Sequence, residues 1–74
     1  MENLFDVILN SLESQSKGRE HFTVCLTLEA ETLNIPFDIY LRIFRQIEDE
    51  GLIFVRRKTK DYFYSISLTS SKSL

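Results

Sequence analysis

The sequence has few of the residues from which covalent cross-links and small active sites are built. Its 74 residues include one cysteine, one histidine, one proline and two glycines. A single cysteine cannot form a disulfide within the chain, which indicates a reducing, cytoplasmic environment. The one histidine, His21, has no cysteine, aspartate or second histidine at the spacing of metal ligands, so we expect no metal site.

Catalytic signatures are missing as well. The sequence contains no glycine-rich loop that would hold a phosphate group, and no nucleophile with an evident general base. Two glycines also leave little scope for an active site built from loops. We therefore expect a protein that is not an enzyme and that needs no cofactor.

Long hydrophobic runs are absent too. No apolar stretch approaches the roughly 20 residues that a membrane-spanning helix needs, so no membrane contact is expected. The N-terminal segment carries acids at Glu2 and Asp6 and has no basic region, so we do not expect a signal peptide. Hydrophobic residues make up 43% of the chain, which is too many for a disordered protein, and the length suits one small domain.

Charge is unevenly distributed along the chain. Residues 1–50 carry ten acids and four bases, residues 51–74 carry five bases and one acid, and the net charge is −2. Four of the bases fall within five residues: Arg56, Arg57, Lys58 and Lys60. This concentration indicates a local contact with an anion, whereas the acidic total argues against extensive non-specific wrapping of nucleic acid.

The first third of the chain predicts a helix, a loop and a strand. Apolar residues recur at spacings of three and four over residues 3–14, as on one face of a helix, and Asn3 is placed to cap it. Residues 15–21 are polar and contain a glycine, so they are expected to form a surface loop. Residues 22–26 alternate as a strand does. Cys25 lies within this strand and is expected to be a buried, small apolar residue.

The middle of the sequence predicts two helices separated by a tight turn. A short helix is expected over residues 28–33, with Thr27 as its N-cap. Asn34 follows where the chain must turn sharply, because asparagine tolerates the left-handed conformation better than other residues except glycine. Ile35 is expected to be a buried anchor, and Pro36 suits the first turn of the next helix.

The third predicted helix covers residues 36–50. Its apolar stripe consists of Ile39 or Tyr40, Ile43, Phe44 and Ile47. Gly51 is placed to end the helix in a left-handed conformation. After Gly51, the spacing of the apolar residues changes at once from the 3.6-residue period of a helix to the two-residue period of a strand.

The last part of the chain predicts a β-hairpin. Residues 52–57 and 62–68 have the composition and alternation of strands, and residues 58–61 form the turn between them. The polar residues 70–74 are expected to be a frayed tail. We therefore expect a single domain over residues 1–69.

Two motifs of the sequence carry a resemblance to a known family: Ala30-x-x-Leu33-Asn34-Ile35 and, after fifteen intervening residues, Gly51-Leu52-Ile53. With the order helix, strand, helix, turn, helix and hairpin, residues 22–69 resemble the winged helix-turn-helix superfamily of bacterial, archaeal and phage regulators. Many of these have a similar Ala-x-x-Leu-Gly-Ile turn and end the third helix with an acidic run and Gly-Leu-Ile. The resemblance implies an α+β fold, with three helices, a short strand and a C-terminal β-hairpin wing.

Members of this superfamily place the third helix in the major groove of DNA and the wing on the adjacent backbone or minor groove. The resemblance therefore implies a sequence-specific protein that binds double-stranded DNA, such as a small transcriptional regulator acting as a homodimer. The third-helix residues that it places against DNA are Phe37, Asp38, Leu41, Arg42 and Arg45. The wing residues that it places against phosphates are Arg56, Arg57, Lys58 and Lys60.

Three of these positions depart from the pattern of the superfamily. Regulators of this type often have Ser, Thr, Lys, Gln or Asn where this chain has Phe37, Asp38 and Leu41. Phe37 and Leu41 suit thymine methyl groups, an apolar contact with a protein, or packing beneath the first helix. An alternative function is therefore a winged-helix protein–protein interaction module within a larger assembly. A homodimer or a protein partner would use Phe37 and Leu41 or the first helix.

Overall fold

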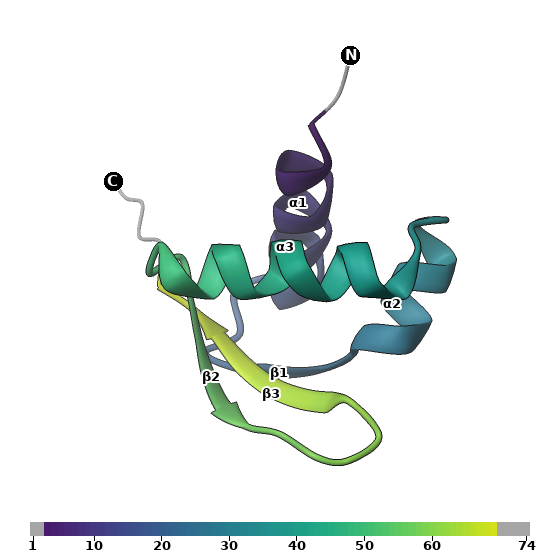
Figure 1. The fold of residues 1–74 in the computed structure, drawn as a ribbon. Coiled ribbons are helices and arrows are strands. Elements are labelled where there is room, and N and C mark those ends of the chain that lie inside the picture. Colours follow the sequence, from purple (N-terminus) through teal and green to yellow (C-terminus); the bar gives the residue numbers. More distant parts are fainter. Residues whose placement is uncertain (1–2, 70–74) are drawn as a thin grey trace.

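The computed structural model describes residues 3–69, and the tail expected at residues 70–74 lies outside them. The described residues form a small α+β domain whose elements follow in the order α1 (Leu4–Ser16), β1 (Phe22–Cys25), α2 (Leu26–Thr32), α3 (Phe37–Asp49), β2 (Ile53–Arg57) and β3 (Phe63–Leu68). The strands form one antiparallel sheet in the order β1-β3-β2, so β3 is central. In Figure 1, α3 lies across the front of the domain and the β2–β3 hairpin extends below it. None of the helices within residues 3–69 is both long and apolar enough to cross a membrane.

The first helix begins as the sequence predicts. The side-chain oxygen of Asn3 accepts a hydrogen bond from the backbone N–H of Phe5 at 2.8 Å, which satisfies one of the free donors at the helix start. The helix continues to Ser16, two residues beyond the predicted end at 14. Lys17 then ends it in the left-handed conformation, with a φ of 41°. The loop before β1 is therefore shorter than expected.

The second helix begins earlier than the sequence suggests. Thr27 is not its N-cap, because α2 starts at Leu26 and the preceding strand ends at Cys25. The backbone N–H of Leu26 donates to the carbonyl oxygen of Tyr62 at 2.9 Å. The hairpin thus satisfies one of the backbone donors that are free at the start of a helix. Leu26 is fully buried as the first residue of the helix.

The turn between α2 and α3 is as predicted. Asn34 has a φ of 61°, in the left-handed region. Its neighbour Ile35 is buried, and its N–H donates to the carbonyl of Ala30 at 2.9 Å. Pro36 precedes the first residue of α3, and its carbonyl accepts the N–H of Tyr40 at 2.9 Å. These local contacts set the direction in which α3 leaves the turn.

The end of α3 is closed by the glycine predicted to end it. Gly51 has a φ of 79°, and its N–H donates to the carbonyl of Glu48 at 2.9 Å. The N–H of Leu52 donates to the carbonyl of Ile47 at 3.2 Å. This is the Schellman pattern, which satisfies carbonyls at the negative end of the helix. The chain then passes directly into β2.

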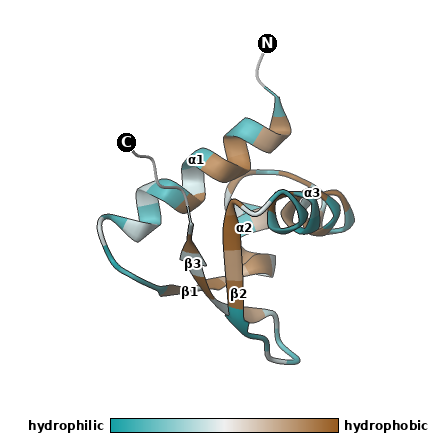
Figure 2. Cartoon of the chain, turned by 90° about the vertical axis from the view of Figure 1, so that its left-hand side faces the viewer, coloured by the Kyte–Doolittle hydropathy of each residue, from teal (hydrophilic) through white to brown (hydrophobic). Residues whose placement is uncertain are grey.

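The core lies between the helices and one face of the sheet. Its buried members are Ile8, Leu12, Phe22, Val24, Leu26, Ala30, Ile35, Tyr40, Phe44, Ile47, Ile53, Tyr64 and Ile66. The sequence predicted that either Ile39 or Tyr40 belongs to the apolar stripe of α3. Tyr40 is fully buried and Ile39 is exposed. Figure 2 shows β2 hydrophobic over its first part and hydrophilic where it enters the turn. The hairpin therefore extends beyond the core, and its basic end reaches solvent.

A polar contact joins all three helices. The Oε1 atom of Glu29 on α2 accepts hydrogen bonds from Ser11 Oγ of α1 at 2.9 Å and from Tyr40 Oη of α3 at 3.4 Å. Its Oε2 atom accepts from Gln15 Nε2 of α1. Burial, the negative charge of Glu29 and the hydrogen bond between Tyr40 and Glu29 raise the pKa of the Tyr40 phenol. The contact helps to fix α3 relative to the two other helices.

Candidate nucleic-acid interface

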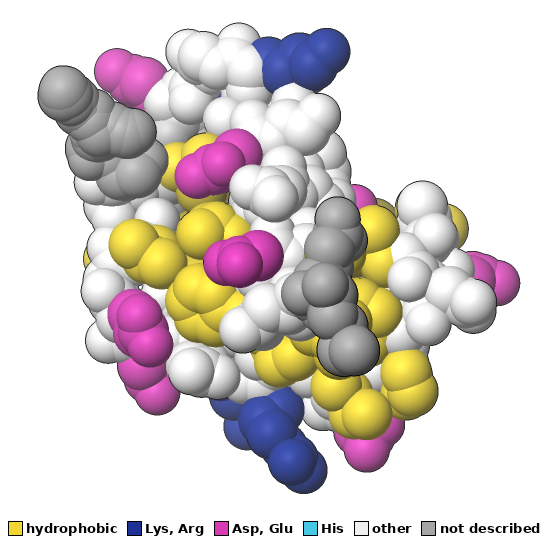
Figure 3. Space-filling view, turned by 90° about the horizontal axis from the view of Figure 1, so that it is seen from above, with side chains coloured by type: hydrophobic (Ala, Val, Ile, Leu, Met, Phe, Trp, Pro, Cys, Tyr) yellow, Lys and Arg dark blue, Asp and Glu magenta, His cyan; other side chains and the backbone are white. Residues whose placement is uncertain are grey.

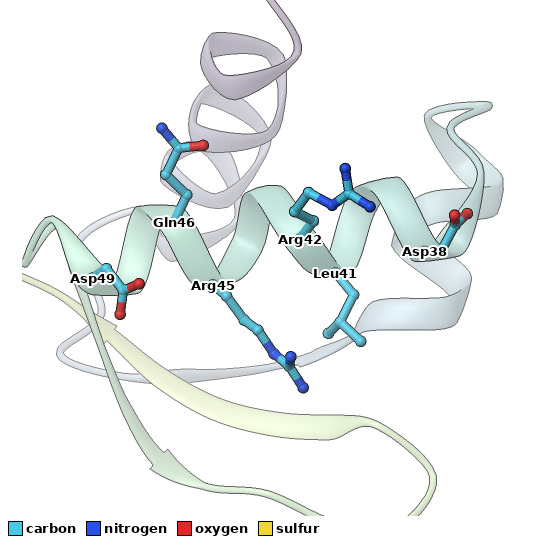
Figure 4. Close-up of a pocket in the computed structure, with 6 residues that line it drawn as sticks. All are labelled: Asp38, Leu41, Arg42, Arg45, Gln46 and Asp49. Atoms are coloured by element: carbon cyan, nitrogen blue, oxygen red, sulfur yellow. The ribbon is translucent and has the colours of Figure 1, made fainter.

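One side of α3 faces away from α1 and from the sheet (Figure 1). Along it lies a shallow depression of about 470 Å³, lined by Asp38, Leu41, Arg42, Arg45, Gln46 and Asp49 (Figure 4). The charged members follow one another at spacings of four, three and four residues, which keeps them on one side of a helix. Asp38, Arg42 and Arg45 are exposed, so the outward position predicted for them is confirmed.

The two arginines of α3 leave the helix in different directions. In Figure 4, Arg45 extends toward the hairpin, whereas Arg42 extends toward the side on which α1 lies. Neither forms a hydrogen bond or ion pair with another described residue. Asp38 lies four residues before Arg42 and Asp49 four residues after Arg45, so each guanidinium has a carboxylate about one turn away. The surface therefore alternates in charge rather than being purely cationic.

The sequence-based set omitted Gln46 and Asp49 from this surface. Both line the same depression as Arg42 and Arg45. Each lies four residues after one of the two arginines, so the helical spacing in the sequence already contained the signal.

Phe37 and Leu41 do not form the solvent-facing apolar pair that the sequence suggested. Both are half-buried and pack against the core. The ring of Phe37 meets the ring of Tyr62 edge-on, with centroids 4.9 Å apart. Tyr62 lies between the turn at residues 58–61 and β3, so the first turn of α3 rests against the turn end of the hairpin. A segment distant in the sequence thus partly covers Phe37, whereas Leu41 still lines the depression beside Arg42.

The basic residues of the hairpin are divided between two regions. A bulge between Val55 and Arg57 leaves Arg56 without a partner on β3. Consecutive residues of a regular strand point to opposite faces of the sheet. The bulge instead brings Arg56 and Arg57 to one depression, on the face turned away from the helices. These two arginines are therefore separate from the tip of the hairpin.

The tip itself carries the two lysines. Lys58 Nζ lies 5.7 Å from the ring centroid of Tyr64, a core residue, so Lys58 is on the helix side of the sheet. Lys60 is exposed within the turn. Thr59 closes the turn: its Oγ1 accepts the N–H of Phe63 at 3.0 Å, and its carbonyl accepts the N–H of Tyr62 at 3.1 Å. This cationic tip lies beyond the core, on the same hairpin that contacts α3.

Cys25 is half-buried rather than buried as predicted. The two-residue alternation that buries Phe22 and Val24 turns Cys25 to the other face of the sheet. Its Sγ lies 3.2 Å from the hydroxyl of Thr27. That hydrogen bond, followed by one with the backbone of Leu28, lowers the pKa of the thiol.

Apolar side chains gather instead on the face formed by α1 and α3, where Figure 3 shows acidic groups among them. Leu4 and Ile39 are exposed by 39% and 37%. Phe5 and Ile43 are half-buried and contribute, from the two helices, to the lining of a depression of about 420 Å³. The exposed apolar surface of α3 is therefore different from the one that the sequence suggested.

Within residues 3–69, no group of three or more His, Cys, Asp or Glu side chains is arranged to hold a metal ion. Comparison of the chain with protein-family models, with curated proteins and with solved structures found no match. The candidate site is thus defined by its own geometry: the exposed, largely polar side of α3 in a small α+β domain, beside a hairpin with a basic tip.

Proposed function

We propose that this protein is a winged-helix domain that binds double-stranded DNA sequence-specifically and acts as a small transcriptional regulator. In this proposal α3 enters the major groove, and the β2–β3 hairpin is the wing on the adjacent backbone. The observation that carries it is the exposed side of α3, where Arg42 and Arg45 are unpaired among described residues. A helix fits the major groove, and arginine can donate two hydrogen bonds to guanine.

The arrangement of elements supports the same proposal. The left-handed turn at Asn34 joins α2 to α3, and Gly51 leads from α3 straight into the hairpin. This order fits the winged helix-turn-helix arrangement expected from the sequence. It leaves the hairpin tip, with Lys58 and Lys60, free to meet phosphate groups.

The acidic residues of α3 are better suited to recognising DNA bases than to increasing the overall affinity for DNA. Asp38 and Asp49 balance the charge of Arg42 and Arg45, so the helix attracts phosphates weakly. A carboxylate can accept a hydrogen bond from the amino group of cytosine, or it can orient an arginine one turn away. We therefore expect α3 to contribute mainly to sequence choice, and the hairpin lysines to contribute mainly to affinity.

Titration of labelled duplex DNA at two salt concentrations tests the proposal, with fluorescence anisotropy as the readout. We expect binding that weakens at the higher salt concentration. The double replacement Arg42→Ala and Arg45→Ala should weaken it, whereas Arg19→Ala, which removes an exposed base from the loop after α1, should change it little. Absence of binding at the lower salt concentration, with the fold intact by circular dichroism, would contradict the proposal.

A second candidate function, a protein-interaction module, is favoured by the apolar surface of α1 and α3. Leu4 of α1 and Ile39 of α3 are exposed, and the half-buried Phe5 and Ile43 line a depression between the two helices. We propose a second copy of the chain as the occupant, because a two-fold contact brings the same apolar surface from both copies together. Sedimentation should show a dimer that Leu4→Ser with Ile39→Ser disrupts. Phe54→Ser, at an exposed position of the hairpin, should leave the dimer intact.

A further inference from the structure

The bulge in β2 builds a second basic surface, on the sheet face turned away from the helices. Thr23 on β1 pairs with Ser65 on β3, and Ser65 pairs with Arg57 on β2. These three residues therefore form a row across the sheet. Neighbouring strands are about 4.8 Å apart, so side chains in one row can contact a single small group.

Two further residues complete this surface. His21, just before β1, and Arg56, the bulged residue, line the same depression of about 380 Å³ as the row. The lining thus contains two guanidinium groups, one imidazole and two hydroxyls, all of which can donate hydrogen bonds. None of the carboxylates in the described part of the chain lines it, and Glu20, next to His21, is exposed outside it.

The bulge is what places both arginines there. In a regular ladder after Val55, whose partner is Ile66, Arg56 would face away from the helices and Arg57 would face them. The extra residue puts Arg57 opposite Ser65 instead, beside Arg56. Bulges commonly re-aim a side chain in this way at functional positions.

We infer that this depression binds the phosphate group of a small phosphorylated molecule. The planar guanidinium fork of arginine matches the oxygens of a phosphate, and hydroxyls such as those of Thr23 and Ser65 can donate to the remaining oxygens. The volume falls within the usual range for small-molecule sites. The site lies on the other face of the sheet from α3, so it does not depend on DNA binding by Arg42 and Arg45.

Titration with glycerol phosphate, followed by ¹⁵N–¹H correlation spectra of the whole chain, tests the inference. We expect saturable shifts of the backbone amides of Thr23, Ser65 and Arg57. Arg57→Gln should weaken binding at least about tenfold, because glutamine cannot form the charge-assisted hydrogen bond to the phosphate. Lys60→Gln removes the same charge from the same hairpin but outside the depression, and should change the affinity by less than about twofold.

Three results would overturn the inference. One is a set of shifts that grows linearly and is reproduced by sodium chloride at equal ionic strength. Another is equal weakening by Arg57→Gln and Lys60→Gln, which would indicate general attraction to the hairpin. The third is a response of Thr23 and Ser65 to duplex DNA but not to glycerol phosphate. Arg42→Ala, on α3, should leave the glycerol phosphate titration unchanged. Failure of the DNA-binding proposal can therefore be told apart from failure of this inference.

Discussion

The rings of Phe37 and Tyr62 meet edge-on, with centroids 4.9 Å apart, and join the start of α3 to the turn end of the hairpin. Aromatic pairs in this geometry stabilise a protein beyond the area that they bury. The contact therefore holds the hairpin at a set angle to α3. If both elements bind one DNA molecule, this apolar contact positions the two polar surfaces relative to each other.

Removing the Phe37 ring should destabilise the protein. For Phe37→Ala we expect the free energy of unfolding to fall by about 1–3 kcal/mol, less than for a fully buried phenylalanine because Phe37 is half-buried. Urea denaturation followed by circular dichroism measures this decrease. The matched control is Phe54→Ala, since Phe54 is exposed by 60%, and its expected effect is within about 0.5 kcal/mol.

The partner of Phe37 can be tested in the same assay. A double-mutant cycle with Phe37→Ala and Tyr62→Ala should give a coupling energy of about 0.5–1.5 kcal/mol. Additive effects of the two substitutions would mean that the rings do not stabilise each other.

Arg42 and Arg45 should control which DNA sequence is chosen. Each single replacement by alanine is expected to reduce discrimination at one base pair by about 1–3 kcal/mol, because alanine cannot form the bidentate hydrogen bonds to a base. Selection of binding sites from a random duplex pool, for the wild type and each variant, measures this. The hairpin variant Lys60→Ala should select the same sequence as the wild type. Unchanged preferences in both arginine variants would remove α3 as the reading helix.

Lys58 and Lys60 should act on affinity instead. Replacing both by alanine should weaken binding to every duplex and lower the slope of log K against log salt by roughly 0.9 for each phosphate that the variant no longer neutralises. The slope is obtained from titrations at several salt concentrations. A slope equal to that of the wild type would show that the tip of the hairpin does not bind the backbone.

Tyr40 should make the stability of the fold depend on pH in the alkaline range. Burial, and then the charge of Glu29, raise the pKa of its phenol above the ordinary value of about 10. The folded protein therefore keeps a proton that the unfolded chain loses, so this contribution is complete below about pH 10 and decreases above it. The limiting slope is about 1.4 kcal/mol per pH unit.

The variant Tyr40→Phe separates this effect from the titration of other groups. It should lower stability at neutral pH by about 0.5–1.5 kcal/mol, because phenylalanine cannot donate the hydrogen bond to Glu29. It should also make the decline of stability above pH 10 less steep than in the wild type. Urea denaturation at several pH values measures both. Parallel declines in the two proteins would show that Tyr40 has no part in the pH dependence.

Much of the fold could be predicted from the sequence, because many decisions are made within a few residues. Asn3 caps α1, Asn34 takes the left-handed conformation between two helices, and Gly51 closes α3. Each outcome depends on the residue itself and on backbone groups nearby in the chain. The outward position of Arg42 and Arg45 follows in the same way, because helical periodicity is a local property.

Other features were decided only by tertiary structure. Leu26 starts α2 because the carbonyl of Tyr62 accepts its N–H, and Phe37 is half-buried because the ring of Tyr62 lies against it. Arg57 faces Ser65 because a bulge shifts the register of β2 on β3. In each case the partner comes from the end of the chain, and no local propensity specifies it. The amino-acid sequence by itself therefore determined the elements and their exposed charges, while packing of the hairpin against the helices decided which of these side chains lie together.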